Sequence, residues 1–419
     1  VSPMGARLMR RWMVLPLKDE QKINERLTAV EALILLPDLR QQIRQLVKQS
    51  GDLERLVAKL PLKKINPREV LHLAKSLQYA AQIRQLCSQT TNTYLQRLSD
   101  TINPCSLIAA EILTTLTEQP PVTVSKGMVI RDGASAELDE LRRIAHHGKE
   151  YLLEIQQRES EATGIPSLKI SFNNVFGYYL EVTNVHKNKV PQNWIRKQTL
   201  ANAERYITPE LKEYEEKITG AEEKIQTIET RLFEALLGRL LEYVAPVQGN
   251  AQAMAILDCL CSFAENALQY KYVKPQLHQG DLLQAKDLRH PVIERQLPAG
   301  EPYIANDLLL DQEQQQIIIL TGPNMSGKSA LLRQTGLMVL MAHMGSFVAA
   351  AEALVPITDK IFTRVGANDN LSGGESTFMV EMNETASIIN NLSSRSLILL
   401  DEIGRGTSTY DGISIAWSI

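Results

Sequence analysis

The residues best placed to do chemistry form a short segment at positions 322–329. They read Gly-Pro-Asn-Met-Ser-Gly-Lys-Ser, which fits the phosphate-binding pattern G-x-x-x-x-G-K-[ST], between an apolar run at 316–320 and a helical pattern. Glycines let backbone N–H groups turn towards phosphate oxygens, the lysine reaches the β- and γ-phosphates, and the serine hydroxyl binds Mg²⁺. We therefore predict that ATP and Mg²⁺ bind here, with the apolar run as a fully buried strand. The nucleotide contacts would be Gly322, Pro323, Asn324, Met325, Ser326, Gly327, Lys328 and Ser329.

A second chemical element follows the apolar run at 397–400, where Asp401 and Glu402 are adjacent. The C-terminal end of a buried strand is where α/β sheets bind their ligands. Asp401 suits the Mg²⁺ shell together with Ser329, and Glu402 suits orienting or deprotonating the attacking water. We predict Glu402 and Lys328 as the catalytic residues of an ATPase.

Residues 371–376 could form a second anion-binding helix N-terminus. They read Leu-Ser-Gly-Gly-Glu-Ser and open the helical pattern that begins at Phe378. The string resembles the signature of ABC-type ATPases, in which the signature of one subunit closes over the γ-phosphate bound by another. A plain glycine-rich turn that caps a helix is the alternative. The ABC interpretation predicts an active site shared across a dimer.

The composition is that of an ordinary globular protein. The formal net charge is −3, so any nucleic-acid contact must come from a local patch. The sparse cysteines favour buried thiols in a reducing cytosol over a zinc site. The apolar stretch 336–355 contains His343 and Glu352, so we expect a buried helix and no membrane partner. The chain opens inside a helical pattern and stops in mid-pattern at Ile419, so we expect a fragment of a cytoplasmic protein.

Four segments should position these motifs. Residues 1–163 have apolar side chains every three or four positions, which predicts helices, the last running from an N-cap at Ser135 to about Thr163. Residues 164–208 alternate apolar and polar side chains and predict a small β-rich insert. Residues 209–277 predict further helices. Residues 278–419 alternate short β runs with helices, as in a parallel α/β sheet.

The clearest periodicity begins after Pro209. Apolar residues step alternately by three and four, which predicts a coiled-coil seam on a helix from 209 to 245 that Pro246 ends. An insert between two long helices favours an antiparallel arm that carries the insert at its tip, and a self-associating rod is the alternative. The seam would consist of Leu211, Tyr214, Ile218, Ala221, Ile225, Ile228, Leu232 and Ala235.

Basic residues crowd the insert between positions 185 and 205, where Glu204 is the one acid. With Asn, Gln and Thr among them, they suit contacts to DNA phosphates, which position a duplex without reading its sequence. A solvated charged loop is the alternative. The predicted DNA-binding residues are Lys187, Lys189, Arg196 and Lys197.

Several longer strings together resemble the MutS family of DNA mismatch-repair ATPases. They are residues 321–329, 361–366, 375–382 and 401–412, and on the N-terminal side 5–8, 176–180 and 196–206. The resemblance implies a multidomain protein: an all-α core and lever with a coiled-coil arm, a clamp at 164–208, and a C-terminal α/β P-loop ATPase domain of the ABC type. It implies that a dimer uses ATP to turn a clamp bound to mismatched double-stranded DNA into a sliding one.

The resemblance also assigns roles to single residues and to partners. Tyr303 would stack on the adenine, and Ser376 would reach the γ-phosphate bound by the other subunit, which is a second copy or a homologue. A repair ATPase of the MutL type would act downstream, and the protein would associate with the nucleoid.

Two residues depart from the family's phosphate loop, which usually reads Gly-Gly-Lys-Ser-Thr. Ser326 replaces the first glycine and Ala330 replaces the threonine, which removes a hydroxyl whose hydrogen bond to a phosphate would contribute about 1.5–3 kcal/mol. We expect weakened ATP binding. The family's mismatch-reading and connector domains are missing, so we do not expect this chain alone to recognise mismatches. The alternatives are a paralogous ABC-like ATPase of recombination and a DNA-binding module that ATP switches without hydrolysis.

Overall fold

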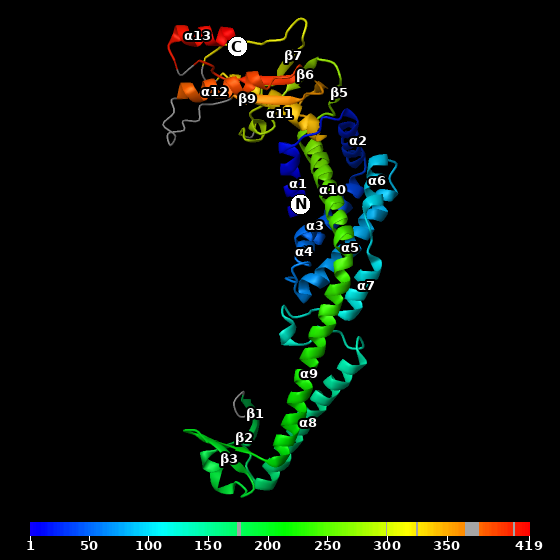
Figure 1. Cartoon of the computed structure of the whole chain (residues 1–419), viewed down its shortest axis with the longest axis vertical. Helices are drawn as coiled ribbons and strands as arrows, with labels where there is room; N and C mark the ends of the chain where they lie inside the picture. Colours follow the sequence, from blue (N-terminus) through cyan, green and yellow to red (C-terminus); the bar gives the residue numbers. More distant parts are fainter. Residues whose placement is uncertain (174–176, 299, 324–325, 365–376, 405–406) are drawn as a thin grey trace. The chain divides into compact units, whose positions relative to one another are not determined.

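The computed structural model describes residues 1–173, 177–298, 300–323, 326–364, 377–404 and 407–419, and they belong to two compact units (Figure 1). Unit 1 comprises Val1–Glu54, Tyr79–Pro104 and Gln248–Ile419, and unit 2 comprises Arg55–Gln78 and Cys105–Val247. The candidate nucleotide residues belong to unit 1 and the candidate DNA-binding residues to unit 2. Each site can therefore be built from its own unit.

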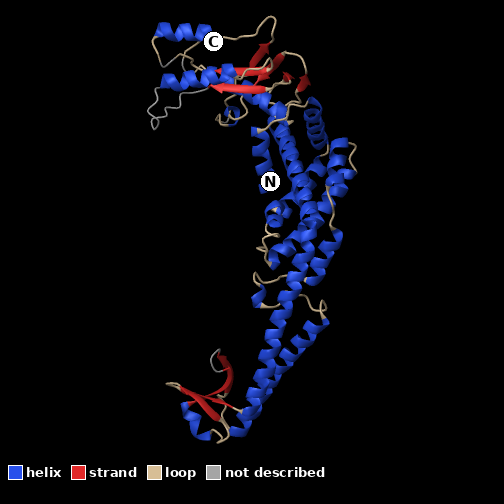
Figure 2. Ribbon diagram, viewed as in Figure 1, coloured by secondary structure: helices blue, strands red, loops and turns tan. Residues whose placement is uncertain are grey.

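The first part of the chain is helical, as the spacing of its apolar residues predicted (Figure 2). Polar caps set the helix starts: the Ser2 hydroxyl accepts from Gly5 N, and the Asp19 carboxylate accepts from Lys22 N. The helices are α1 (Pro3–Val14), α2 (Glu20–Leu35), α3 (Pro37–Ser50), α4 (Leu53–Ala58), α5 (Pro67–Ser88), α6 (Thr93–Thr101) and α7 (Ser106–Thr115).

The α/β part of unit 1 contains two small sheets where the sequence predicted one parallel sheet. β5 (Gln276–His278), β8 (Glu352–Pro356), β6 (Leu283–Leu288) and β7 (Asn306–Leu310) are neighbours in that order, and only β5 and β8 run parallel. β9 (Lys360–Arg364) and β10 (Ser396–Leu400) form a separate parallel pair. The prediction was wrong for the larger sheet. Parallel neighbours need a long crossover, usually an α-helix, and the described residues between β6 and β7 contain none.

Three helices complete this part: α11 (Lys328–Met344), α12 (Thr377–Asn390) and α13 (Thr409–Ser418). α11 buries Met338, Val339 and Ala342 against the four-stranded sheet. The stretch 336–355, predicted as one buried helix, is the end of α11 followed by the start of β8, because Gly345 ends the helix with a φ of +82°. Within the described part of the chain, we find no helix that combines the length and apolar character needed to span a membrane.

The apolar run at 316–320 is not the buried strand that the sequence predicted. It has no regular secondary structure, and Ile317 and Ile319 are 77% and 82% exposed. A buried strand needs neighbours that bond its backbone on both sides. Among the described residues β9 and β10 pair only with each other, and no strand pairs with this run. Apolar character alone therefore did not make a strand.

In unit 2, the long helix predicted from Ser135 to Thr163 is confirmed as α8 (Ala136–Thr163). The Ser135 hydroxyl accepts from the Leu138 N–H, and Gly164 ends the helix in the left-handed conformation. On this helix Ile144 is exposed, whereas Gly148 packs against the facing helix. A Cβ on Gly148 would lie 2.5 Å from Ile218 of the facing helix, so only glycine allows this close approach.

That facing helix is α9 (Pro209–Leu240), which is shorter than the predicted 209–245. It ends in the 3₁₀ turn η3 (Leu241–Tyr243), and α10 (Val244–Tyr270) follows. Pro246 was predicted to stop the helix, but it lies in the first turn of α10. Proline is tolerated there because the first N–H groups of a helix have no intrahelical acceptor.

The predicted seam on α9 is correct near its start and wrong near its end. Leu211, Ile218, Ala221 and Ile228 are buried, whereas Ala235 is exposed. A straight helix drifts by about 20° per heptad, so a strict 3.5-residue stripe rotates away from its partner. In addition, the later part of α9 packs against α7 and the 3₁₀ turn η1 (Val124–Lys126). The buried residues there are Phe233, Leu236, Leu237 and Leu240.

α8 and α9 lie side by side and antiparallel, as predicted (Figure 1). Glu137 near the start of α8 pairs with Arg231 late in α9, and Tyr151 stacks on Tyr214 with ring centroids 4.0 Å apart. The insert between them is an antiparallel sheet with the order β1-β2-β4-β3. Its strands are β1 (Lys169–Asn173), β2 (Gly177–Thr183), β3 (Ile195–Thr199) and β4 (Ala203–Ile207). We call this sheet with its connections the tip sheet.

Candidate functional site

The predicted phosphate-binding segment leads directly into α11. Gly327 precedes the helix with a φ of +92°, and Gly322 has a φ of +151°, so both glycines occupy backbone conformations that side chains disfavour. The first N–H groups of α11 therefore follow a turn that only glycine forms without strain, which is a geometry suited to anions. Asn324 and Met325 lie outside the described residues.

The ammonium group of Lys328 lies over this turn. It donates to the carbonyl oxygen of Gly322 and, at 3.3 Å, to that of Pro323. Ser329 and Ala330 occupy the first turn of α11, and the Ser326 hydroxyl lies 3.3 Å from where a Cβ on Gly322 would be. The sequence departure at Ser326 therefore places a polar side chain against the turn.

Asp401 and Glu402 directly follow β10, and Asp401 N donates to Arg364 O at the end of β9 at 2.7 Å. Glu402 has a φ of +54°, a strained conformation for a residue with a side chain. Such strain persists only where the surroundings impose it, and it concentrates at functional sites.

Three residues that sequence reasoning did not single out hold this segment. The buried Glu381 of α12 accepts a hydrogen bond from Gly404 N. Gly404 packs against the backbone of Gly412, and a Cβ on Gly404 would lie 2.7 Å from Gly412 Cα. Their signal was present in the sequence, because all three fall in the strings 375–382 and 401–412.

α11 packs directly on β10, which brings together the two elements that carry the candidate nucleotide residues. Gly336 allows the contact, since a Cβ there would lie 2.8 Å from Leu399 Cδ1. The helix that follows the phosphate-binding segment and the strand that precedes Asp401 are thus packed directly against each other.

Tyr303, predicted to stack on adenine, is fixed to the same helix through its hydroxyl. It donates to Gln334 Oε1 at 2.7 Å, and the fully buried Gln334 donates in turn to Asn306 Oδ1 at 3.2 Å. Burial raises the pKa of Tyr303. The ring is therefore oriented by α11. Ser376 and the whole predicted signature at 371–376 lie outside the described residues.

The four predicted DNA-binding residues are all exposed, and they lie on two neighbouring elements of unit 2. Lys187 and Lys189 belong to the 3₁₀ turn η2 (Asn184–Lys189), and Arg196 and Lys197 belong to β3. The pairing of β3 with β4 shifts between Arg196 and Gln198, so Lys197 lies at a β-bulge. A bulge adds a local twist and redirects a side chain. Trp194, which lies between these residues in the sequence, is buried in the core beneath them.

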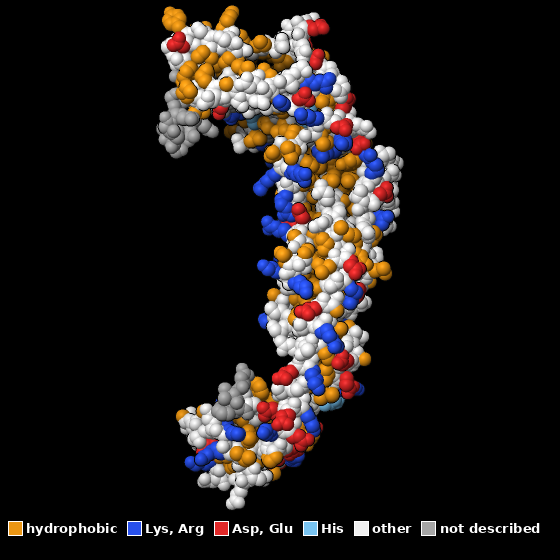
Figure 3. Space-filling model, viewed as in Figure 1, with side chains coloured by type: hydrophobic (Ala, Val, Ile, Leu, Met, Phe, Trp, Pro, Cys, Tyr) orange, Lys and Arg blue, Asp and Glu red, His pale blue; other side chains and the backbone are white. Residues whose placement is uncertain are grey.

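The charge of this group is partly balanced, because both basic and acidic side chains lie in the region of the tip sheet (Figure 3). Arg196 lies 3.4 Å from Glu204, and Lys189 Nζ donates to Gly164 O at 3.0 Å. The Tyr206 hydroxyl donates to Glu204, and this bond, together with Arg196 and Lys187, holds the pKa of Glu204 below its ordinary value. Glu204 thus stays ionised and lowers the local positive charge.

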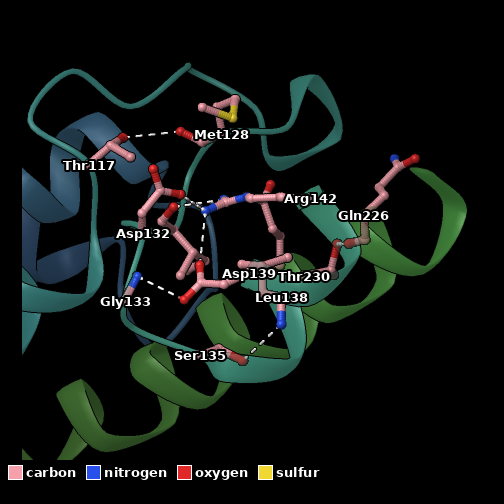
Figure 4. Close-up of polar contacts among 12 residues, drawn as sticks. Thr117, Met128, Asp132, Gly133, Ser135, Leu138, Asp139, Arg142, Gln226 and Thr230 are labelled. Carbon is pink, nitrogen blue, oxygen red and sulfur yellow. Dashed lines mark hydrogen bonds and ion pairs between the residues drawn. The ribbon is translucent and has the colours of Figure 1, made fainter. Parts of the chain in front are cut away.

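A charge network around a buried carboxylate lies near the start of α8, and sequence reasoning missed it (Figure 4). The Arg142 guanidinium donates to Glu229 Oε1 at 2.6 Å, to Ile130 O at 2.8 Å, and to Asp132. Glu229 is fully buried, and its second oxygen has no hydrogen-bond partner among the described residues. Arg142 is therefore the cation that makes this buried carboxylate tolerable.

Comparison with known proteins places the chain in one family. The family model described as MutS domain III matches residues 1–264, and that described as MutS domain V matches residues 318–419. The DNA mismatch repair proteins MutS of Bacteroides fragilis and Flavobacterium johnsoniae are each 59% identical over 419 residues, which is 100% of this chain and 49% and 48% of theirs. The chain thus spans about half the length of the curated relatives it matches. It belongs to the MutS family of DNA mismatch-repair proteins.

Proposed function

We propose that this chain carries the ATP-hydrolysing and DNA-backbone-binding parts of a MutS-type mismatch-repair protein. The observation that carries the proposal is the packing of α11, which follows the phosphate-binding segment, on β10, which ends at Asp401 and Glu402. Residues 278–419 would then form the P-loop ATPase domain. Residues 1–163 and 209–277 would form the core and lever, and residues 164–208 the clamp.

The residues at the phosphate-binding segment fit Mg²⁺-ATP. Gly322 and Gly327 have backbone conformations that allow N–H groups to face a phosphate, and Lys328 needs only to exchange carbonyl acceptors for phosphate oxygens. Ser329 and Asp401 would hold Mg²⁺, which supplies neutralisation of the phosphate charge. Glu402 would orient and deprotonate water. Tyr303, whose hydroxyl is held by Gln334 of α11, would contact the adenine, and Ser376 would act across a dimer of two copies or homologues.

The tip sheet would hold double-stranded DNA by its phosphates. Lys187, Arg196 and Lys197 are exposed, and Lys189 would have to leave the Gly164 carbonyl to join them. Contacts of this kind carry no sequence information. Mismatch reading would therefore belong to other parts of the protein, and ATP would govern how long the clamp remains on DNA. The protein would act in the cytoplasm at the nucleoid, followed by a MutL-type ATPase.

The enzymatic part is tested by Glu402→Gln in the natural full-length protein. Loss of ATP turnover with ATP binding retained supports hydrolysis at this site, because the amide can still occupy the position but cannot take a proton. The control is Glu313→Gln, an exposed glutamate of the same unit. If the wild-type protein binds ATP and never hydrolyses it, the alternative of a non-hydrolysing switch, which Ala330 motivates, replaces this proposal.

The DNA-binding part is tested by changing Lys187, Lys189, Arg196 and Lys197 together to Ala. Each lost phosphate contact lowers the slope of log affinity against log salt by about 0.9, so four contacts give a change of about 3.6. Lys212→Ala with Lys224→Ala, two exposed lysines of α9, is the control and should leave the slope nearly unchanged. A wild-type slope in the quadruple variant contradicts the assignment.

A further inference from the structure

The far end of α11 is fastened to the N-terminal helices of unit 1 through its last carbonyl groups. A helix leaves its final carbonyls without intrahelical donors. Here Leu17 N donates to His343 O at 3.1 Å, and the Arg26 guanidinium donates to Met344 O at 3.0 Å. Leu17 lies between α1 and α2, and Arg26 lies on α2. The end of α11 is therefore capped by the opposite end of the chain.

The side chain of His343 adds a second connection at the same place. It is 2% exposed, with Nδ1 2.7 Å from Leu17 O and Nε2 accepting from Thr358 N at 3.2 Å. A carbonyl oxygen can only accept, so Nδ1 carries the proton. One imidazole thus joins the connection between α1 and α2, the end of α11, and the segment after β8.

Arg26 fills the space between α2 and the end of α11; we call the contacts of His343 and Arg26 at this place the joint. Its guanidinium lies 3.6 Å from the centre of the Trp12 ring, and a Cβ on Gly345 would lie 2.4 Å from Arg26 Cβ. Gly345 also has a φ of +82°, so both its space and its backbone require glycine. A displacement of α11 would break these contacts as a set, because packed interiors switch between arrangements and do not deform smoothly.

The other end of α11 is the phosphate-binding segment, about 25 Å away for 17 residues at 1.5 Å each. We propose that His343 is a positioning residue, which transmits displacements of α11 on nucleotide binding to α1 and α2 through its bond to Leu17. The inference rests on the proposed binding of ATP at 322–329. Lys328 must release the carbonyls of Gly322 and Pro323 to reach a phosphate, and this exchange occurs in the first turn of α11.

The test separates the two bonds of His343 by amide substitution in the natural full-length protein. His343→Leu removes both bonds. His343→Asn keeps a donor at the Nδ1 position towards Leu17, and His343→Gln keeps an acceptor at the Nε2 position towards Thr358. His278→Leu is the control, because His278 also makes two backbone hydrogen bonds, but to Leu282 and Gly280 of its own turn. ATP affinity, ATP turnover and the ATP-dependent change in dissociation rate from a mismatched duplex are measured for each variant.

We expect the Leu and Gln variants to lose a factor of about 5 or more of the ATP effect on DNA dissociation, the lower end of allosteric couplings. ATP affinity should stay within about threefold of wild type. A variant that merely damaged the structure would lose ATP affinity as well. The Asn and His278 variants should behave like wild type. A full ATP effect in the Leu variant, or rescue by Gln and not by Asn, overturns the inference. The proposed function itself requires that ATP changes the rate of DNA dissociation of the wild-type protein and that Lys328→Met abolishes this change. If either result is missing, the proposed function fails, and the role of His343 is not the cause.

Discussion

The two candidate sites differ in how far along the chain their supporting contacts reach. In the tip sheet, Arg196 meets Glu204, and Lys189 meets Gly164, all within the insert itself. On the helix that follows the nucleotide segment, contacts span more of the chain: Tyr303 meets Gln334 across 31 positions, and Leu17 meets His343 across 326. The tip sheet is a local construction, and the nucleotide segment is assembled from remote pieces.

This difference determines what each site should tolerate. A site held by local contacts keeps its geometry while its own small core holds, and here that core is built from α8, α9 and the strands. A site assembled from remote segments responds to changes far from its chemistry, since a shift of about 1 Å can cost roughly 100-fold in rate. The following predictions test this contrast, beginning with the largest effect.

Arg142→Met should destabilise unit 2 by about 3–5 kcal/mol, because it leaves the buried Glu229 without its cation. DNA binding through the tip should weaken with it, while ATP binding in unit 1 should persist. Arg143→Met, at an exposed neighbour, is the control. Chemical denaturation measures the loss. If Arg142→Met with Glu229→Leu is no more stable than Arg142→Met alone, the account of the network is wrong.

Lys328→Met should weaken ATP binding by about 10- to 150-fold, since a hydrogen bond to a charged group contributes about 1.5–3 kcal/mol. DNA affinity without nucleotide should not change, because the tip sheet lies in the other unit. Titration with a fluorescent ATP analogue measures the loss, and Lys360→Met, at an exposed lysine of β9, is the control. Equal ATP affinity in wild type and Lys328→Met would show that ATP does not bind at this segment.

Gly404→Ala should slow ATP hydrolysis by about 10- to 100-fold with little loss of ATP affinity, because a displaced Asp401–Glu402 segment misplaces the attacking water. The new methyl group would meet the Gly412 backbone at 2.7 Å, on a residue whose φ is +81°. Gly300→Ala is a matched control, since that glycine also has a positive φ but has open space around it. Steady-state kinetics measures the turnover. An unchanged turnover in Gly404→Ala would show that the contact between Gly404 and Gly412 does not position Asp401 and Glu402.

The smallest effect concerns the Tyr206–Glu204 bond, which should make a small contribution to the stability of unit 2. Burial and Glu204 raise the pKa of Tyr206 to about 12, so the contribution is complete below the ordinary tyrosine pKa and lost as pH rises towards 12. The depressed pKa of Glu204 means that the contribution is also lost as pH falls through that value. The stability difference between wild type and Tyr206→Phe, followed by denaturation, should therefore be constant near neutral pH and shrink at both extremes. A difference that does not vary with pH would contradict this.

The sequence alone determined the features that depend on neighbours within a few residues. α8 follows its N-cap Ser135 and ends at Thr163, as predicted, because capping involves only the adjacent turns. The start of the α9 seam followed its apolar spacing, and the insert between the two helices was evident from the change of period from 3.6 to 2. The strings around the nucleotide segment identified the family for the same reason, since they are contiguous in sequence.

Only the tertiary structure decided the features that depend on a partner elsewhere. Residues 316–320 have the composition of a buried strand but pair with no strand among the described residues. Pro246 was expected to end a helix, but it lies in the first turn of α10. The pairing of Arg142 with Glu229 and the joint at His343 link positions that no local pattern relates. Secondary structure follows from short-range sterics and capping. Burial, strand pairing and ion pairing depend on which residues, distant in the sequence, pack against one another in the fold.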